Sequence, residues 1–115
     1  MQQAHAQRAA GRLTEATLLE AAEHADALMT AALLAVAAKV PVAVVEQAAS
    51  LRSAKALVSL VWKAGFSMRV AGPVQALLGH LGPKQALAAG EEAGGFPLTV
   101  EEMRWQVDFL QHIGR

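Results

Sequence analysis

The segment from Asp26 to Lys39 constrains the fold more than any other part of the chain. Its first and last residues are its only charged residues, and all those between them except Thr30 are apolar. This pattern is typical of a helix that is buried nearly all round. Asp26 can serve as an N-cap, Lys39 places a cation near the carbonyl end, and Pro41 hinders continuation of the helix. We therefore expect a buried helix at the centre of the fold.

A membrane span is the alternative for this part of the chain, because an apolar stretch runs from Ala27 to Val45. Lys39 and Pro41 interrupt that stretch, and alanine, its commonest residue, transfers only weakly into lipid. We therefore predict a core helix followed by a second helix, and no membrane span.

The composition predicts one all-α domain. The 115 residues suffice for one hydrophobic core, and 54% of them are hydrophobic although only 4% are aromatic. Alanine, which has the highest helix propensity, supplies much of this apolar content. Residues 1–115 are therefore expected to form a single helical domain. The helical pattern opens abruptly at residue 2, so a longer natural chain that ends in this domain is the alternative.

The charges and the absence of cysteine exclude several classes of function. Ten basic and ten acidic residues cancel, so the chain has no general electrostatic attraction to nucleic acid or to anionic lipid. Without cysteine there can be no disulfide, no thiolate zinc site and no cysteine nucleophile. The N-terminal residues lack an apolar segment of signal-peptide length. We expect a cytoplasmic protein.

Capping residues and helix breakers divide the chain into six to eight short helices. The expected N-caps are Thr14, Asp26, Ser53, Ser67 and Thr99, the last in a capping box with Glu102. Helices are expected over residues 2–10, 15–25, 27–39, 41–50, 54–63, 68–78, 84–89 and 100–113. Gly72 and Pro73 are expected to kink or divide the helix over 68–78, and residues 91–97 to form a loop. A strand over 40–45 is the competing interpretation, which we reject because the chain offers no second strand to pair with it.

Short links between these helices predict antiparallel hairpins that stack in chain order. Helix punctuation recurs in four places: Gly11-Arg12-Leu13-Thr14 before Leu18-Leu19, the alanine- and leucine-rich helix before Val40-Pro41-Val42, Lys63-Ala64-Gly65-Phe66-Ser67, and Phe96-Pro97-Leu98-Thr99 with Glu102-Met103-Arg104-Trp105-Gln106. With these motifs, the chain from Gly11 onward resembles a family of uncharacterised bacterial proteins built from HEAT-like helical repeats, a domain of unknown function. The resemblance implies a stacked helical fold that forms the C-terminal part of longer members. It implies no activity, cofactor or catalytic residue.

The residues that could carry chemistry do not form a recognisable catalytic or metal-binding set. Glu20 and His24 share one helix face and could begin a metal site, but Zn²⁺ needs at least three protein ligands, so a solvated face is favoured. The hydroxyl groups fall mostly at helix starts, where capping explains them. We therefore predict no enzymatic activity, no catalytic, cofactor-binding or metal-binding residue, and no small-molecule substrate.

Residues of about 42–64 have the outline of a helix-turn-helix, with 53–63 as the recognition helix. Its outward residues would include Arg52, Ser53, Lys55, Ser59 and Lys63, which could contact phosphate. The helix contains no Asn, Gln or Arg to read base edges, and the domain is neutral. An ordinary helical hairpin is therefore favoured, and a DNA-binding regulator is the alternative function.

A non-enzymatic protein-interaction or regulatory module is the leading interpretation. Trp62 and Trp105 are large anchors of the kind that interfaces prefer, with Arg69 and Arg104 as polar partners. A place in the core is the favoured alternative for each tryptophan, because a core rich in alanine needs bulky fillers. An open end of a helical stack would also leave an apolar face uncovered and favour self-association. We therefore predict a protein partner or self-association.

Overall fold

The computed structural model describes residues 15–82, 84–92 and 95–113, and within these ranges the chain is all-α. The helices, in chain order, are α2 (Glu15–Glu23), α3 (Ala27–Ala38), α4 (Val42–Ser50), α5 (Ala54–Lys63), α6 (Met68–Gly79) and α7 (Val100–Ile113). The prediction of an all-α fold is confirmed. The helix predicted over 2–10 and the Thr14 cap lie outside the described residues.

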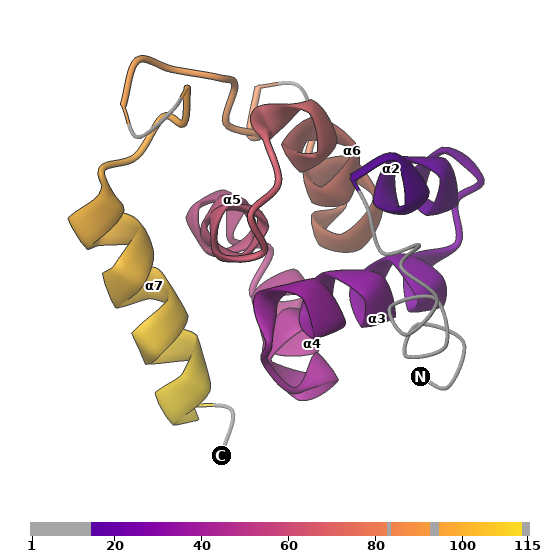
Figure 1. The fold of residues 1–115 in the computed structure, drawn as a ribbon, viewed down its shortest axis with the longest axis horizontal. Coiled ribbons are helices and arrows are strands. Elements are labelled where there is room, and N and C mark those ends of the chain that lie inside the picture. The colour runs from indigo at the N-terminus through magenta and orange to yellow at the C-terminus, as the bar shows by residue number, and fades with distance from the viewer. Residues whose placement is uncertain (1–14, 83, 93–94, 114–115) are drawn as a thin grey trace.

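Helix α5 lies at the centre of the fold. It packs against α3, α4, α6 and α7, and all six residues from Ala56 to Val61 are buried. In Figure 1 this helix is seen nearly end-on, with α7 on one side and α3, α4 and α6 on the others. The sequence suggested that α3 is the central helix, but α5 is. The polar residues in α5 made its burial harder to predict.

Helix α3 is buried as predicted, apart from its first turn. Its interior from Thr30 to Val36 is buried, whereas Leu28 is 85% exposed. Asp26 is the N-cap, since its Oδ1 accepts a hydrogen bond from the Met29 N–H at 3.1 Å. At the other end Lys39 adopts a left-handed conformation (φ 59°), and the Val40 N–H donates to the carbonyl of Ala35 at 3.0 Å, which closes the helix.

Two turns, one before α4 and one before α5, set the positions of these helices. Pro41 precedes α4 as its N-cap, and residues 42–50 are helical, so the strand alternative is wrong. Arg52 turns the chain in a left-handed conformation (φ 51°), and the Ser53 hydroxyl then accepts the Ala56 N–H at 3.1 Å as the predicted cap of α5. The Arg52 guanidinium donates to the carbonyls of Gly79 and His80, at 3.2 and 2.8 Å, and so satisfies the C-terminal end of α6.

Helix α6 runs unbroken from Met68 to Gly79 with Pro73 inside it, so of the two predicted outcomes, a kink or a division, the division is wrong. A residue before proline usually avoids the helical region because its Cβ meets the proline ring. Gly72 has no Cβ, which removes that contact. The pair that looked like a helix break is therefore compatible with a continuous helix.

The helix predicted over 84–89 is absent, because one buried side chain holds the backbone in another conformation. Only a turn forms, in which the Gly82 carbonyl accepts the N–H groups of Gln85 and Ala86. Gln75 on α6 is fully buried; its Nε2 donates to the Leu87 carbonyl at 3.0 Å, and its Oε1 accepts the Leu87 N–H at 2.7 Å. This double hydrogen bond fixes the loop to α6.

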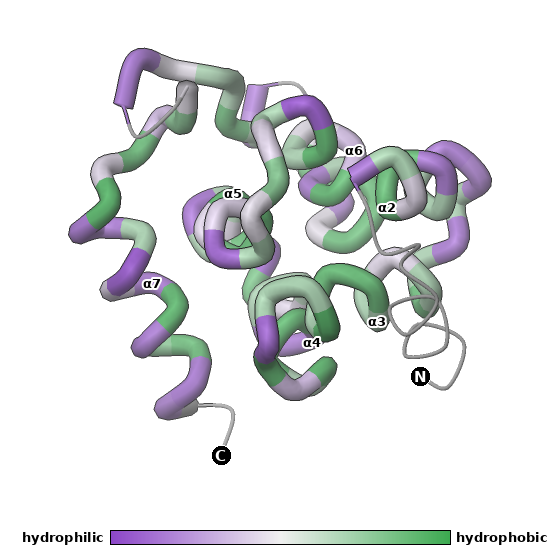
Figure 2. The backbone as a smooth tube through the Cα atoms, viewed as in Figure 1, coloured by the Kyte–Doolittle hydropathy of each residue, from purple (hydrophilic) through white to green (hydrophobic). Residues whose placement is uncertain are grey.

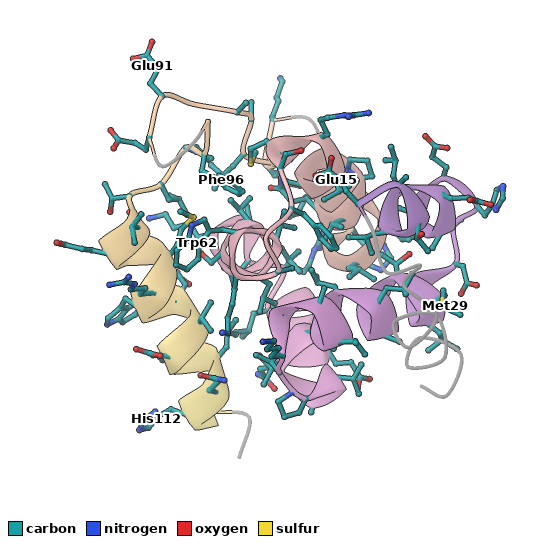
Figure 3. The ribbon with its side chains drawn as sticks, viewed as in Figure 1. Glu15, Met29, Trp62, Glu91, Phe96 and His112 are labelled. Carbon is teal, nitrogen blue, oxygen red and sulfur yellow. The ribbon has the colours of Figure 1, made fainter. Side chains whose placement is uncertain are left out.

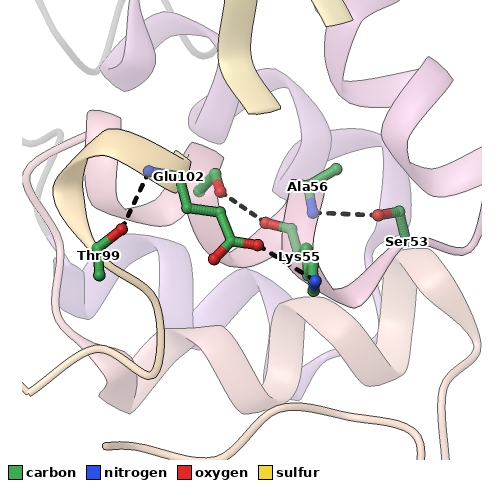
Figure 4. Close-up of polar contacts among 6 residues, drawn as sticks. Ser53, Lys55, Ala56, Thr99 and Glu102 are labelled. Carbon is green, nitrogen blue, oxygen red and sulfur yellow. Dashed lines mark hydrogen bonds and ion pairs between the residues drawn. The ribbon is translucent and has the colours of Figure 1, made fainter. Parts of the chain in front are cut away.

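In the loop predicted over 91–97, the described residues 91–92 and 95–97 are not helical, and Glu92 and Phe96 form an isolated β-bridge. Phe96 and Leu98 are buried and anchor the loop to the core. Thr99 then caps α7 by accepting the Glu102 N–H at 3.2 Å. The other half of the predicted capping box is replaced: the Glu102 carboxylate lies 3.1 Å from Lys55 Nζ on α5 (Figure 4).

Helices that are distant in sequence also touch, since α2 packs against α6 and α4 against α7. Helices α3, α4, α6 and α7 surround α5 in addition to these contacts. Repeats of the HEAT-like kind stay a prediction. Among the described residues, none of the helices is both long and apolar enough to cross a membrane.

Candidate interaction surface on helix α7

Helix α7 is held to the body of the protein by one face and presents the opposite face to solvent. Met103 and Leu110 are fully buried and Val107 nearly so, and the helix packs closely on α5. These three residues recur at spacings of four and three, which defines a single apolar stripe. Figure 2 shows polar and apolar residues alternating along α7, and Figure 1 shows the helix at one edge of the fold.

The outward face of α7 carries two aromatic side chains. Trp105 is 59% exposed and Phe109 is 42% exposed. Their rings stack on each other with centroids 5.3 Å apart and planes inclined by only 5°. Residues four apart lie above one another on a helix, which explains the stacking. For Trp105 the core interpretation is therefore wrong, and a large apolar surface remains in contact with water.

A groove of about 500 Å³ lies between α5 and α7, beside this outward face. Its lining consists of Trp62, Lys63, Arg104, Val107, Asp108 and Gln111. Trp62 is partly buried and packs against the core from the α5 side of the groove (Figure 3). Within the described ranges, Lys63, Arg104 and Asp108 form no ion pair with each other or with a neighbour. The groove thus combines one aromatic wall with charges that are free to meet a ligand.

The structure brings three of the four predicted interaction residues together. Trp62 and Arg104 line the same groove, and Trp105 lies on the adjacent face of α7. Arg69 lies elsewhere, at the start of α6, where its Nη1 is 3.9 Å from the Glu15 carboxylate. Phe109, on the same outward face, is not among the predicted interaction residues. Its spacing of four from Trp105, on the face opposite Met103 and Leu110, was the signal that could have identified it.

A polar cluster joins α2 to α6 around Glu15. The Glu15 Oε1 accepts a hydrogen bond from the Ser67 hydroxyl at 2.6 Å and another from the Ser67 N–H at 2.5 Å. The Ser67 oxygen in turn accepts the Arg69 N–H and caps α6. These hydrogen bonds, with a smaller contribution from the Arg69 charge, lower the pKa of Glu15 below its ordinary value. The Arg69 side chain stays largely exposed beside this cluster, and its role as an interaction residue stays a prediction.

Most of the residues expected to contact DNA form contacts within the chain, although Arg52 and Lys55 are exposed. Arg52 caps α6, Lys55 pairs with Glu102, and the buried Ser59 hydroxyl donates to the Lys55 carbonyl at 2.6 Å. Helix α5 itself is covered by α7 and the other helices, so it has no free face for a DNA groove. The DNA-binding alternative stays a prediction that the position of α5 does not favour.

The helix face that could have begun a metal site forms part of a shallow hollow. Glu20 and His24 line it together with Asp26 and Met29. Among the residues whose positions are described, no three His, Asp or Glu side chains gather closely enough to hold a metal ion.

Comparisons with known protein families, with curated proteins and with solved structures found no match. Function must therefore be inferred from the geometry of α7 and its neighbours. The resemblance to HEAT-like repeat proteins stays a prediction.

Proposed function

We propose that the chain is a non-enzymatic protein-interaction module whose partner binds the outward face of α7. The observation that carries this proposal is the exposed, stacked pair Trp105 and Phe109. Aromatic residues dominate the energetics of protein interfaces, and tryptophan is prominent among residues whose truncation costs most binding energy.

The surroundings of the pair fit an interface. A typical interface has an apolar centre and a polar rim. Here Glu101, Arg104, Asp108 and His112 lie beside the two rings and are mostly exposed, although Arg104 and Asp108 also border the groove. The rings thus form the apolar centre and the charged side chains form the rim.

The support of α7 also favours binding. Met103 and Leu110 are fully buried against the core, and the Thr99 cap and the ion pair between Lys55 and Glu102 hold the first turn. A helix already held in place loses less conformational freedom when a partner docks than a mobile segment would.

The absence of enzymatic activity belongs to the same proposal. The hydroxyl groups of Ser53, Ser67 and Thr99 are used as helix caps, and that of Ser59 donates to a backbone carbonyl. Such hydrogen bonds explain these side chains without a catalytic base. We place the module in the cytoplasm, which the location of a fluorescently tagged full-length protein would test.

The proposal is tested by affinity capture with the full chain as bait, comparing the wild type with the double variant Trp105→Ala, Phe109→Ala. We expect the double variant to lose the proteins that the wild type binds. Leu28→Ala is the matched control, because Leu28 is an exposed apolar residue on another helix. Retention of all bound proteins by the double variant, or an equal loss with the control, would contradict the proposal.

A further inference from the structure

We infer that the partner of the α7 face is a second copy of this chain, with two α7 helices packed antiparallel about a two-fold axis. This inference rests on the proposed function and names the partner for the same surface. It is carried by the order of the charged residues along the edge of α7 that flanks the aromatic pair.

Four charged or titratable residues follow that edge at helical spacings: Glu101, Arg104, Asp108 and His112. From the N-terminal to the C-terminal end they read acid, base, acid, histidine. The same series read backwards is histidine, acid, base, acid. An antiparallel copy therefore sets an acid opposite a base or a histidine at every position, which is the self-complementarity that a two-fold interface requires.

The spacing along the helix axis agrees with this pairing. A two-fold axis at the level of Val107 lies midway between Trp105 and Phe109, so each tryptophan faces the other copy's phenylalanine. With a rise of about 1.5 Å per residue, Arg104 of one copy and Asp108 of the other lie within about 3 Å of the same level. Glu101 and the other copy's His112 lie within about 1.5 Å of the same level.

A parallel arrangement is disfavoured by the same charges, because it would set Arg104 against Arg104 and Asp108 against Asp108. Competition within one chain is also small. In the described part of the chain, the four edge residues form no ion pair, whereas Glu102 on the opposite edge is already paired with Lys55. Figure 3 shows His112 pointing away from the body of the protein, where a second molecule can reach it.

The expected dimer is weak. Helix α7 has 14 residues and is therefore about 21 Å long. Two such helices bury less than the roughly 1,600 Å² of a standard interface, so association should depend on concentration.

Sedimentation equilibrium over a range of concentrations tests the inference. We expect the wild type to dimerise, and Arg104→Asp and Asp108→Arg to weaken self-association at least about tenfold each, because each variant sets like charges opposite one another. An equimolar mixture of the two variants should recover the wild-type affinity within a factor of about three, because Asp then faces Arg at both positions. The loss of affinity in each variant alone identifies the antiparallel pairing, because a parallel pairing would set like charges together in the wild type already, and the mixture would then bind more tightly than the wild type.

Circular dichroism melting must show that both variants fold, and Lys63→Asp is the matched control for a charge reversal on α5 outside the edge. A wild-type chain that stays monomeric at all concentrations would overturn the inference. So would a dimer whose affinity the two variants leave unchanged, or a mixture that associates no more tightly than either variant alone. If that monomer still captures another protein through Trp105 and Phe109, the proposed function stands and only the self-pairing fails. If capture is also indifferent to these two residues, both fail.

Discussion

Helices α3 and α7 have similar lengths but differ in composition and in how much of their surface is buried. Helix α3 is almost entirely apolar and disappears into the core from Thr30 to Val36, whereas α7 is mostly polar and buries only one stripe. The large apolar surface that stays in water nevertheless lies on the polar helix, as Trp105 and Phe109. The most hydrophobic helix, α3, thus serves as a scaffold. The candidate binding surface lies on α7, whose composition is mostly polar.

Both helices expose large apolar side chains, and the difference between them is instructive. Leu28 on α3 is 85% exposed but isolated, and single exposed apolar residues are common on protein surfaces. Trp105 and Phe109 stack on one another beside a groove and a row of unpaired charges. Grouping, rather than exposure alone, marks the α7 face as a binding surface.

The largest expected effect tests whether α3 is the scaffold. Leu33 is fully buried in α3, so Leu33→Ala should leave a cavity and lower the free energy of unfolding by about 3 kcal/mol. Chemical denaturation measures this loss. Leu28→Ala, five residues earlier on the same helix, should change stability by less than about 0.5 kcal/mol. Equal losses in the two variants would show that α3 is not buried in the way described.

A smaller change in the opposite direction is expected at Thr30. Its side chain is fully buried in α3, and among the described residues its hydroxyl has no hydrogen-bond partner. Thr30→Val keeps the shape and removes the unsatisfied group, so the melting temperature should rise by an amount equivalent to about 1 kcal/mol. Thr30→Ser, which keeps the hydroxyl and loses the methyl group, is the control and should be destabilising. A loss of stability in the valine variant would mean that the hydroxyl is bonded after all.

The attachment of α2 to α6 should depend on pH. Hydrogen bonds from Ser67 lower the pKa of Glu15 below 4.5, its ordinary value. The ionised form is therefore favoured in the folded state, so its contribution is present above pH 4.5 and is lost as the pH falls through the lowered pKa. Thermal melting from neutral to acidic pH measures the loss. Glu15→Gln should lose stability at neutral pH and show a shallower decline in acid; an unchanged decline would exclude Glu15 as its source.

Local signals predicted much of the helical framework. The caps at Asp26, Ser53, Ser67 and Thr99 each involve residues only two or three positions apart, which a single sequence displays. The absence of the helix predicted over 84–89 arose instead from a contact across the chain. The Gln75 side chain forms hydrogen bonds with the backbone of Leu87, 12 residues further along the chain, and no local sequence pattern predicts this contact.

The candidate surface was predictable in part. Trp62, Arg104 and Trp105 were identified as interaction residues by type alone, and the fold gathers them around the groove and α7. That Arg69 belongs to the Glu15 cluster depends on how α2 meets α6 and could not be read from the sequence. The order of the charged residues along α7 could be read from the sequence. Their role in binding could be proposed only from the structure, which places α7 at the edge of the fold.

The most direct test of the contrast between scaffold and surface is the double variant Trp105→Ala, Phe109→Ala, followed by sedimentation equilibrium on protein shown to be folded. Because both rings are substantially exposed, the free energy of unfolding should fall by less than about 1 kcal/mol. We expect this variant to be folded and monomeric at concentrations where the wild type dimerises. A folded variant that still dimerises as the wild type does would contradict it.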